Sequence, residues 1–234
     1  MALPKINAAP KYEITVPSTQ QAVRFRPYLV KEEKILMMAM ETQDQKQALA
    51  AIVDTIISCL QEPIDQNLLT TFDVEYMFTQ IRAKSVGESA KIAVPCKQCD
   101  HSNEIEIPLE SITVKNLDNQ NTLIELTPEI TLKMKWPSYN SVVSADQGLS
   151  STEQTFALIA ACIESVQTPD EHVKLSDETE ADVQAFIESL SSGQFNKIKS
   201  HVENIPKMEH ELKFECTSCN TENTRMLSGI SDFF

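Results

Sequence analysis

Two Cys-x-x-Cys pairs constrain the fold of this chain more than any other feature. They use four of the six cysteines among 234 residues: Cys96, Cys99, Cys216 and Cys219. Each pair follows a strand-like run and is followed directly by Asp100 or Asn220, residue types that tolerate a left-handed backbone. Two strand ends that are far apart in the sequence are therefore expected to meet.

Four thiolates in this pattern predict a structural zinc site. One Cys-x-x-Cys turn presents two sulfurs, and two such turns supply the four tetrahedral ligands, at about 2.3 Å, that zinc prefers. Protein ligands would fill all four positions and leave none for a substrate water, which argues against catalytic zinc. The alternatives are unpaired buried thiols, or a ribbon that keeps its shape without metal. Cys59 and Cys162 lie on helical apolar stripes and are expected in the core.

Charge and hydropathy exclude several classes of function. The formal net charge is −14, the pI is about 4.7, and we find no basic patch for phosphate backbones, so nucleic acid is not an expected partner. No apolar run approaches the roughly 20 residues that span a membrane. The first residues lack the apolar core of a signal peptide. We therefore expect a reducing cytoplasm, where cysteine pairs bind metal more often than they form disulfides.

Motifs typical of enzymes are missing from the sequence. GxGxxG, GxxxxGK[ST], HExxH and GxSxG do not occur, and the four histidines are scattered. Only four glycines are present, which argues against a glycine-rich nucleotide site. We therefore expect neither catalytic residues nor a small-molecule substrate, although catalytic triads are spatial and need not show in a sequence.

Hydrophobic periodicity predicts an α+β fold. Four parts follow along the chain: an N-terminal arm and β-hairpin over residues 1–30, a helical block over 31–87, a small antiparallel β module with the zinc ribbon over 88–136 plus 207–234, and a helical insertion over 137–206. The first hairpin alternates apolar and polar residues on both sides of a turn at residues 17–21. Asp44 with Gln47, and Ser150 with Glu153, have the spacing of helix-capping boxes.

Two groups of residues are suited to contacts with another protein. Arg82, Lys84 and Glu88 lie near the end of a predicted helix, where the two cations could equally just match the helix dipole. Phe233 and Phe234 end the sequence, and they are expected either to pack back on the ribbon or to insert into a partner. Both interpretations stay open for each group.

Several segments resemble a known family of phage proteins. They are "LPKINAAPKYEITVPSTQQAVRFRPYLVKEEKILMMAME", "FDVEYMFTQIRAKSVGE", the two knuckles "CKQC" and "CTSC", and "LSGISDFF". Together they are similar to the baseplate hub subunits and hub assembly proteins of T-even-type contractile-tailed bacteriophages. The resemblance implies a structural or assembly role in the virion, with other baseplate and hub proteins as partners. It also implies a location in the host cytoplasm during assembly and then in the tail baseplate.

Two other functions are compatible with the sequence. A zinc-ribbon adaptor that binds a transcription factor or another host or phage complex need not touch DNA, so an acidic charge permits it. An assembly chaperone, or an enzyme with a hidden site, is the other alternative. An adaptor would co-purify with polymerase and be absent from phage tails, whereas a hub protein would be found with tail proteins.

Overall fold

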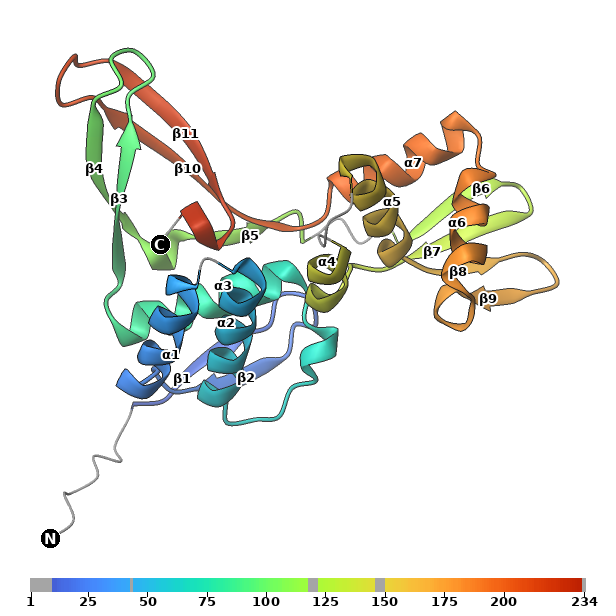
Figure 1. The fold of residues 1–234 in the computed structure, drawn as a ribbon, viewed down its shortest axis with the longest axis horizontal. Coiled ribbons are helices and arrows are strands. Elements are labelled where there is room, and N and C mark those ends of the chain that lie inside the picture. Colours follow the sequence, from blue (N-terminus) through green and yellow to red (C-terminus); the bar gives the residue numbers. More distant parts are fainter. Residues whose placement is uncertain (1–9, 43, 118–121, 146–149, 233–234) are drawn as a thin grey trace, which may run out of the picture. The chain divides into compact units, whose positions relative to one another are not determined.

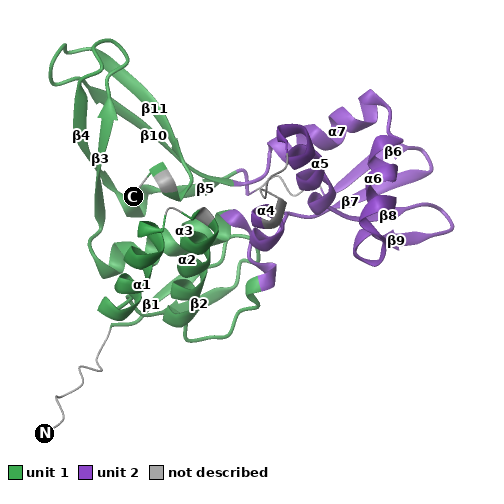
Figure 2. Ribbon diagram, viewed as in Figure 1, with its two compact units in different colours: residues 1–66, 72–115, 207–234 green, residues 67–71, 116–206 purple. Residues whose placement is uncertain are grey.

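A computed structural model describes residues 10–42, 44–117, 122–145 and 150–232 (Figure 1). The fold is α+β, with helices and small antiparallel sheets, as the sequence predicts. The chain divides into two compact units (Figure 2): unit 1 with residues 1–66, 72–115 and 207–234, and unit 2 with residues 67–71 and 116–206.

The N-terminal part of unit 1 is a hairpin followed by helices. Its elements are β1 (Tyr12–Thr15), β2 (Ala22–Phe25), α1 (Val30–Glu41), α2 (Gln45–Cys59) and α3 (Thr71–Ser85). The 3-10 helix η1 (Gln66–Leu68) between α2 and α3 belongs mostly to unit 2. Asp44 caps α2, because its Oδ1 accepts hydrogen bonds from the N–H groups of Lys46 and Gln47 at 2.9 and 3.2 Å. The predicted capping box is not completed, since the N–H of Asp44 donates to Thr42 Oγ1 at 3.3 Å and not to the Gln47 side chain. The apolar stripe of α3 faces the core: Val74, Met77, Phe78 and Ile81 are all buried.

The rest of unit 1 consists of two β-hairpins. Their elements are β3 (Ser89–Pro95), β4 (Ser102–Pro108), η2 (Leu109–Ser111), β5 (Thr113–Lys115), β10 (Lys207–Glu215), β11 (Glu222–Ser228) and η4 (Ile230–Asp232). β3 pairs with β4, while β10 lies between β11 and β5 in a second sheet. Val94 and Ile107 from one hairpin share an apolar core with Leu212 and Leu227 from the other. This shared core holds the two cysteine turns in one module.

Unit 2 combines helices with a four-stranded antiparallel sheet of order β6-β7-β8-β9. Its elements are β6 (Leu123–Thr127), β7 (Ile130–Met134), α4 (Tyr139–Ala145), α5 (Ser151–Cys162), β8 (Ile163–Gln167), β9 (His172–Lys174), η3 (Leu175–Asp177), α6 (Glu180–Glu188) and α7 (Ser192–Glu203). The predicted capping box at α5 is confirmed: Ser150 Oγ accepts from the N–H of Glu153 at 3.3 Å, and Glu153 Oε2 accepts from the N–H of Ser150 at 2.7 Å.

The structure differs from the sequence analysis in how the chain is organised. The predicted β module over residues 88–136 included β6 and β7, but β7 pairs with β8, so both strands belong to unit 2. The predicted helical insertion over residues 137–206 also contains β8 and β9. α5 ends at Cys162, and Ile163 begins β8. The buried Ser165 of β8 is paired by the His172 ring, whose Nε2 lies 2.8 Å from its hydroxyl.

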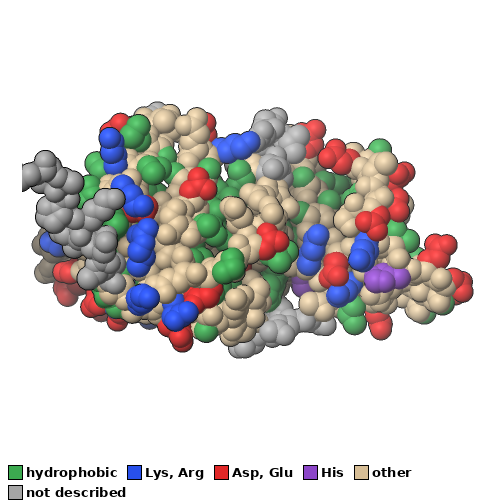
Figure 3. Space-filling model, turned by 90° about the horizontal axis from the view of Figure 1, so that it is seen from below, with side chains coloured by type: hydrophobic (Ala, Val, Ile, Leu, Met, Phe, Trp, Pro, Cys, Tyr) green, Lys and Arg blue, Asp and Glu red, His purple; other side chains and the backbone are tan. Residues whose placement is uncertain are grey.

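On the face drawn in Figure 3, several basic side chains follow one another in a row on the left of the view, while acidic side chains are scattered over the face. The formal net charge of the sequence is −14. Within the described ranges, every helix is too short or too polar to cross a bilayer.

Candidate metal centre

The two cysteine hairpins are built on the same plan. The pairing ends with Pro95 opposite Ser102 in β3–β4, and with Glu215 opposite Glu222 in β10–β11. The two pairings have the same register: adding 120 to each residue number of the β3–β4 pairing gives the β10–β11 pairing, so that Pro95 corresponds to Glu215. The chain therefore uses one structural element twice, with a Cys-x-x-Cys sequence in the turn each time.

Each cysteine turn directs backbone amides at a sulfur. The N–H of Gln98 donates to Cys96 Sγ at 3.4 Å, and the N–H of Asp100 donates to the Cys96 carbonyl at 3.0 Å. The other turn repeats both bonds around Cys216, at 3.4 and 2.9 Å. The backbone φ is 55° at Asp100 and 56° at Asn220, which confirms the predicted left-handed conformation. The turns thus have the form of metal-binding knuckles.

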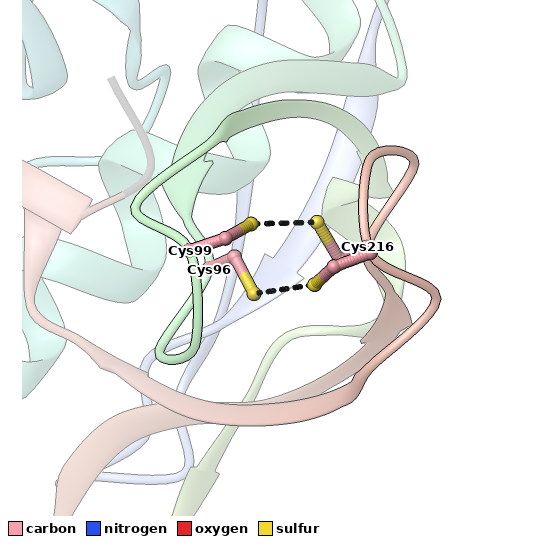
Figure 4. A group of neighbouring side chains, drawn as sticks. Cys96, Cys99 and Cys216 are labelled. Atoms are coloured by element: carbon pink, nitrogen blue, oxygen red, sulfur yellow. Dashed lines mark hydrogen bonds between the residues drawn. The ribbon is translucent and has the colours of Figure 1, made fainter.

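The four sulfurs point toward one another between the two turns (Figure 4). Cys96 Sγ lies 3.7 Å from Cys219 Sγ, and Cys99 Sγ lies 3.7 Å from Cys216 Sγ. All four sulfurs lie within 4.8 Å of one another. A zinc ion about 2.3 Å from each sulfur of a regular tetrahedron places the sulfurs about 3.8 Å apart. Two edges therefore already have tetrahedral length, and the donor set fits zinc.

The cysteines of each pair differ in exposure. Cys96 and Cys216, the first of each pair, are both 1% exposed, whereas Cys99 and Cys219 are exposed. The cluster therefore combines two cysteines anchored inside the module with two cysteines at its surface.

The sulfurs also differ in proton affinity. The N–H of Gln98 lowers the pKa of the Cys96 thiol to about 6, against an opposing effect of burial. The pKa of Cys99 is raised to about 12: the N–H of His101 lowers it, but Cys219 and the other neighbouring sulfurs disfavour a further negative charge. A bound cation removes this disadvantage because it stabilises thiolates. Without a metal ion, the four thiols do not all ionise easily, because neighbouring thiolates repel one another. A bound metal ion would relieve this repulsion.

The predicted contact residues have less uniform surroundings. Arg82 is half-buried in α3. Lys84 Nζ lies 2.8 Å from Glu88 Oε1 and 2.5 Å from Glu110 Oε1, so its charge is paired within the chain. Glu88 is exposed. The last two predicted residues lie outside the described part of the chain: Phe233 and Phe234.

Two further residues of the metal centre were missed in the sequence analysis. Asn103 and Asn223 are 3% and 4% exposed, and each makes a hydrogen bond to a cysteine sulfur of the opposite hairpin. The signal was present in the sequence, because Cys-x-x-Cys-x-x-x-Asn occurs in both turns. An asparagine in a polar turn has many other roles, so the repeat gains meaning only when both copies are compared.

Comparison with protein families assigns the class of this protein. A family model described as "T4 bacteriophage base plate protein" matches residues 9–234. The chain belongs to this family. The match of the T4 base plate protein family includes all four clustered cysteines, all of unit 2, and unit 1 from residue 9 onward. Membership supports a structural role in the phage tail baseplate, with other phage proteins as partners. No curated protein and no solved structure matches the chain.

Proposed function

We propose that this protein is a structural or assembly component of the baseplate hub, and that it works through contacts with other hub and baseplate proteins. The observation that carries the proposal is the family match over residues 9–234. The segments that resemble hub subunits and hub assembly proteins support the finer assignment to the hub. No catalytic step is part of the proposed role.

A structural zinc ion is the second part of the proposal. Its ligands are the four clustered cysteines: Cys96, Cys99, Cys216 and Cys219. The two sulfur–sulfur distances of 3.7 Å and the amides directed at Cys96 and Cys216 support this assignment. With four protein ligands, the ion stabilises the fold and binds no substrate. Its binding free energy contributes to the folding free energy of unit 1.

An exposed apolar surface supports a role in protein contacts. Six of the ten exposed large hydrophobic side chains in the described ranges belong to α1 or precede it directly: Leu29, Val30, Ile35, Met37, Met38 and Met40. We call these six residues the α1 surface. Exposed apolar side chains gathered on one segment are candidates for an interaction site, and flexible methionines adapt to differently shaped partners. In the proposal, the α1 surface contacts another baseplate protein.

The charged residues at the end of α3 form a second proposed contact. Arg82, Lys84 and Glu88 come from a segment that resembles the hub family. Lys84 is already paired with two carboxylates of its own chain, so a partner would meet a network of charges and not a single free cation. This contact is therefore expected to add specificity more than affinity.

Fractionation of infected cells tests the proposed function. Assembly intermediates, baseplates, tails and virions are separated on a gradient, and the protein is quantified in each fraction by mass spectrometry. A fixed ratio to other tail proteins in mature particles supports a structural hub subunit. Presence only in light intermediates supports an assembly factor. Absence from all of these, together with co-purification with polymerase, would overturn the proposal and favour a zinc-ribbon adaptor.

A further inference from the structure

Two buried asparagines occupy equivalent positions in the cysteine hairpins. Asn103 is the second residue of β4, after the first turn, and Asn223 is the second residue of β11, after the second turn. Their side chains are almost fully buried, at 3% and 4% exposure. A buried carboxamide costs free energy unless its donors and acceptor find partners. The partners of both side chains therefore show what the two residues do.

Each carboxamide reaches across to the opposite hairpin. Asn103 Nδ2 lies 3.7 Å from Cys216 Sγ, and its Oδ1 accepts from the backbone N–H of Thr217 at 2.9 Å. Asn223 Nδ2 lies 3.4 Å from Cys96 Sγ, and its Oδ1 accepts from the backbone N–H of Lys97 at 3.0 Å. Both side chains thus donate to the buried cysteine of the other turn and accept from the residue that follows it.

Each carboxamide is also fixed to its own turn. Asn103 Nδ2 donates to the His101 carbonyl at 3.0 Å, and Asn223 Nδ2 donates to the Thr221 carbonyl at 2.8 Å. These are the same carbonyls that accept from the N–H groups of Cys96 and Cys216, at 2.9 and 3.0 Å. Each carboxamide is therefore oriented by a carbonyl of its own turn, while its Nδ2 also contacts the cysteine sulfur of the other turn.

We propose that Asn103 and Asn223 are positioning residues of the metal centre, which hold the Cys96 and Cys216 thiolates in place across the two hairpins. This inference rests on the proposed zinc site. An N–H that donates to a thiolate reduces the negative charge that four sulfurs concentrate on one ion, and it fixes the direction of the sulfur. Because the arrangement is reciprocal, neither hairpin completes its own half of the site without the other.

Substitution of Asn103 or Asn223 by aspartate distinguishes donation of an N–H to the sulfur from a purely steric role of the side chain. Asp has nearly the shape of Asn and can still accept from the N–H of Thr217 or Lys97. It offers no N–H to the sulfur and places a negative charge beside it. Alanine removes every hydrogen bond of the carboxamide and adds no charge. Thr224 is exposed and adjacent to Asn223 on β11, so Thr224→Ala serves as the matched control in the same strand.

The experiment uses the full-length protein with zinc, and again with cobalt(II) in its place. Zinc release to a chromophoric chelator is timed, and the sulfur-to-cobalt charge-transfer band is recorded. We expect N103D and N223D each to weaken metal binding by about tenfold or more. The band should move to lower energy, because loss of the N–H raises the energy of the sulfur electrons. T224A should match the wild type in both measurements.

The outcomes separate this inference from the proposed function. If the wild type binds no metal, the zinc site fails and the positioning role fails with it. If the wild type binds zinc, and the variants keep its release rate and its charge-transfer band while only melting earlier, the asparagines are structural and the positioning role alone is wrong. If N103D or N223D does not fold, N103A and N223A remove the donor without a buried charge, and the same two measurements decide.

Discussion

Cys96 Sγ lies 3.7 Å from Cys219 Sγ, although 123 positions separate the two residues. A metal held at this point ties two distant segments of the chain together, so its binding stabilises the folded state directly. We expect reduced, purified protein to contain about one zinc ion per chain, and we expect chelation to lower its melting temperature. Elemental analysis together with thermal unfolding, with and without a chelator, measures both effects.

Cysteine variants distinguish the metal ligands from the other thiols. Cys216→Ser is expected to lose most of the metal, whereas Cys162→Ala is expected to keep it, because Cys162 is buried in α5 and is not one of the four clustered cysteines. Protein that carries no metal while its cysteines are reduced, and that melts identically in chelator, would show that the module folds without an ion.

Glu75 makes the stability of unit 1 depend on pH. Its Oε1 lies 3.2 Å from the position that a Cβ atom at Gly229 would occupy, and burial raises its pKa to about 7. The folded state therefore holds the proton more tightly than the unfolded state, whose value is 4.5. The contribution of the protonated Glu75 to the free energy of unfolding is complete below pH 4.5, and it is lost as the pH rises through about 7. Its full size is up to about 3 kcal/mol.

The change that isolates this effect is Glu75→Gln. Urea unfolding of the wild type and E75Q at pH 4.5 and pH 8 should show the variant gaining relative stability at the higher pH, because glutamine remains neutral in both states. Glu41→Gln, at an exposed position of α1, controls for the loss of one acidic residue. A difference between E75Q and wild type that is the same at both pH values would contradict the prediction.

Lys84 holds two carboxylates near the end of α3. Glu110 and Glu88 raise its pKa, Glu110 more strongly, so it stays charged throughout the physiological range. Lys84→Glu brings three carboxylates together and is expected to lower the melting temperature, by less at high salt because ions screen the repulsion. Lys174→Glu, at an exposed position of β9, is the control. An unchanged melting temperature with lost baseplate assembly would instead indicate a contact with a partner.

The α1 surface should matter for assembly more than for folding. Met38 is 56% exposed, so Met38→Glu is expected to leave the melting temperature unchanged within about 1 °C, as for exposed surface substitutions generally. It should nevertheless reduce incorporation into baseplates, because a charge there would be buried without a partner. Leu123→Glu, at 51% exposure in β6, controls for a new exposed charge. Equal incorporation of both variants would remove the α1 surface from the proposed contacts.

Local chemistry made several features predictable from the sequence. The caps at Asp44 and Ser150, and the left-handed residues Asp100 and Asn220, each depend on atoms a few positions away along the chain. The meeting of the two Cys-x-x-Cys turns was also predictable, because four thiols in this spacing favour one tetrahedral site. Such features need no knowledge of how distant segments pack.

Features that depend on distant partners were missed. β8 contains Ser165 at a buried position, where its hydroxyl is paired with the His172 ring of β9. Ile163 lies four positions after Ile159, which is the spacing of a helical stripe, yet it begins β8. The contact of Asn103 with the sulfur of Cys216 was likewise not predictable, because Cys216 lies on the other hairpin, 113 positions away.

The chain leaves unit 1 after Lys115 and returns at Lys207, and these two residues face each other on the paired strands β5 and β10. The point of departure is therefore an ordinary antiparallel corner in which most of unit 2 takes the place of a short turn. Closing a longer loop costs little additional entropy. Evolution can accordingly lengthen, shorten or exchange this inserted part among related phages while every cysteine of the cluster keeps its neighbours.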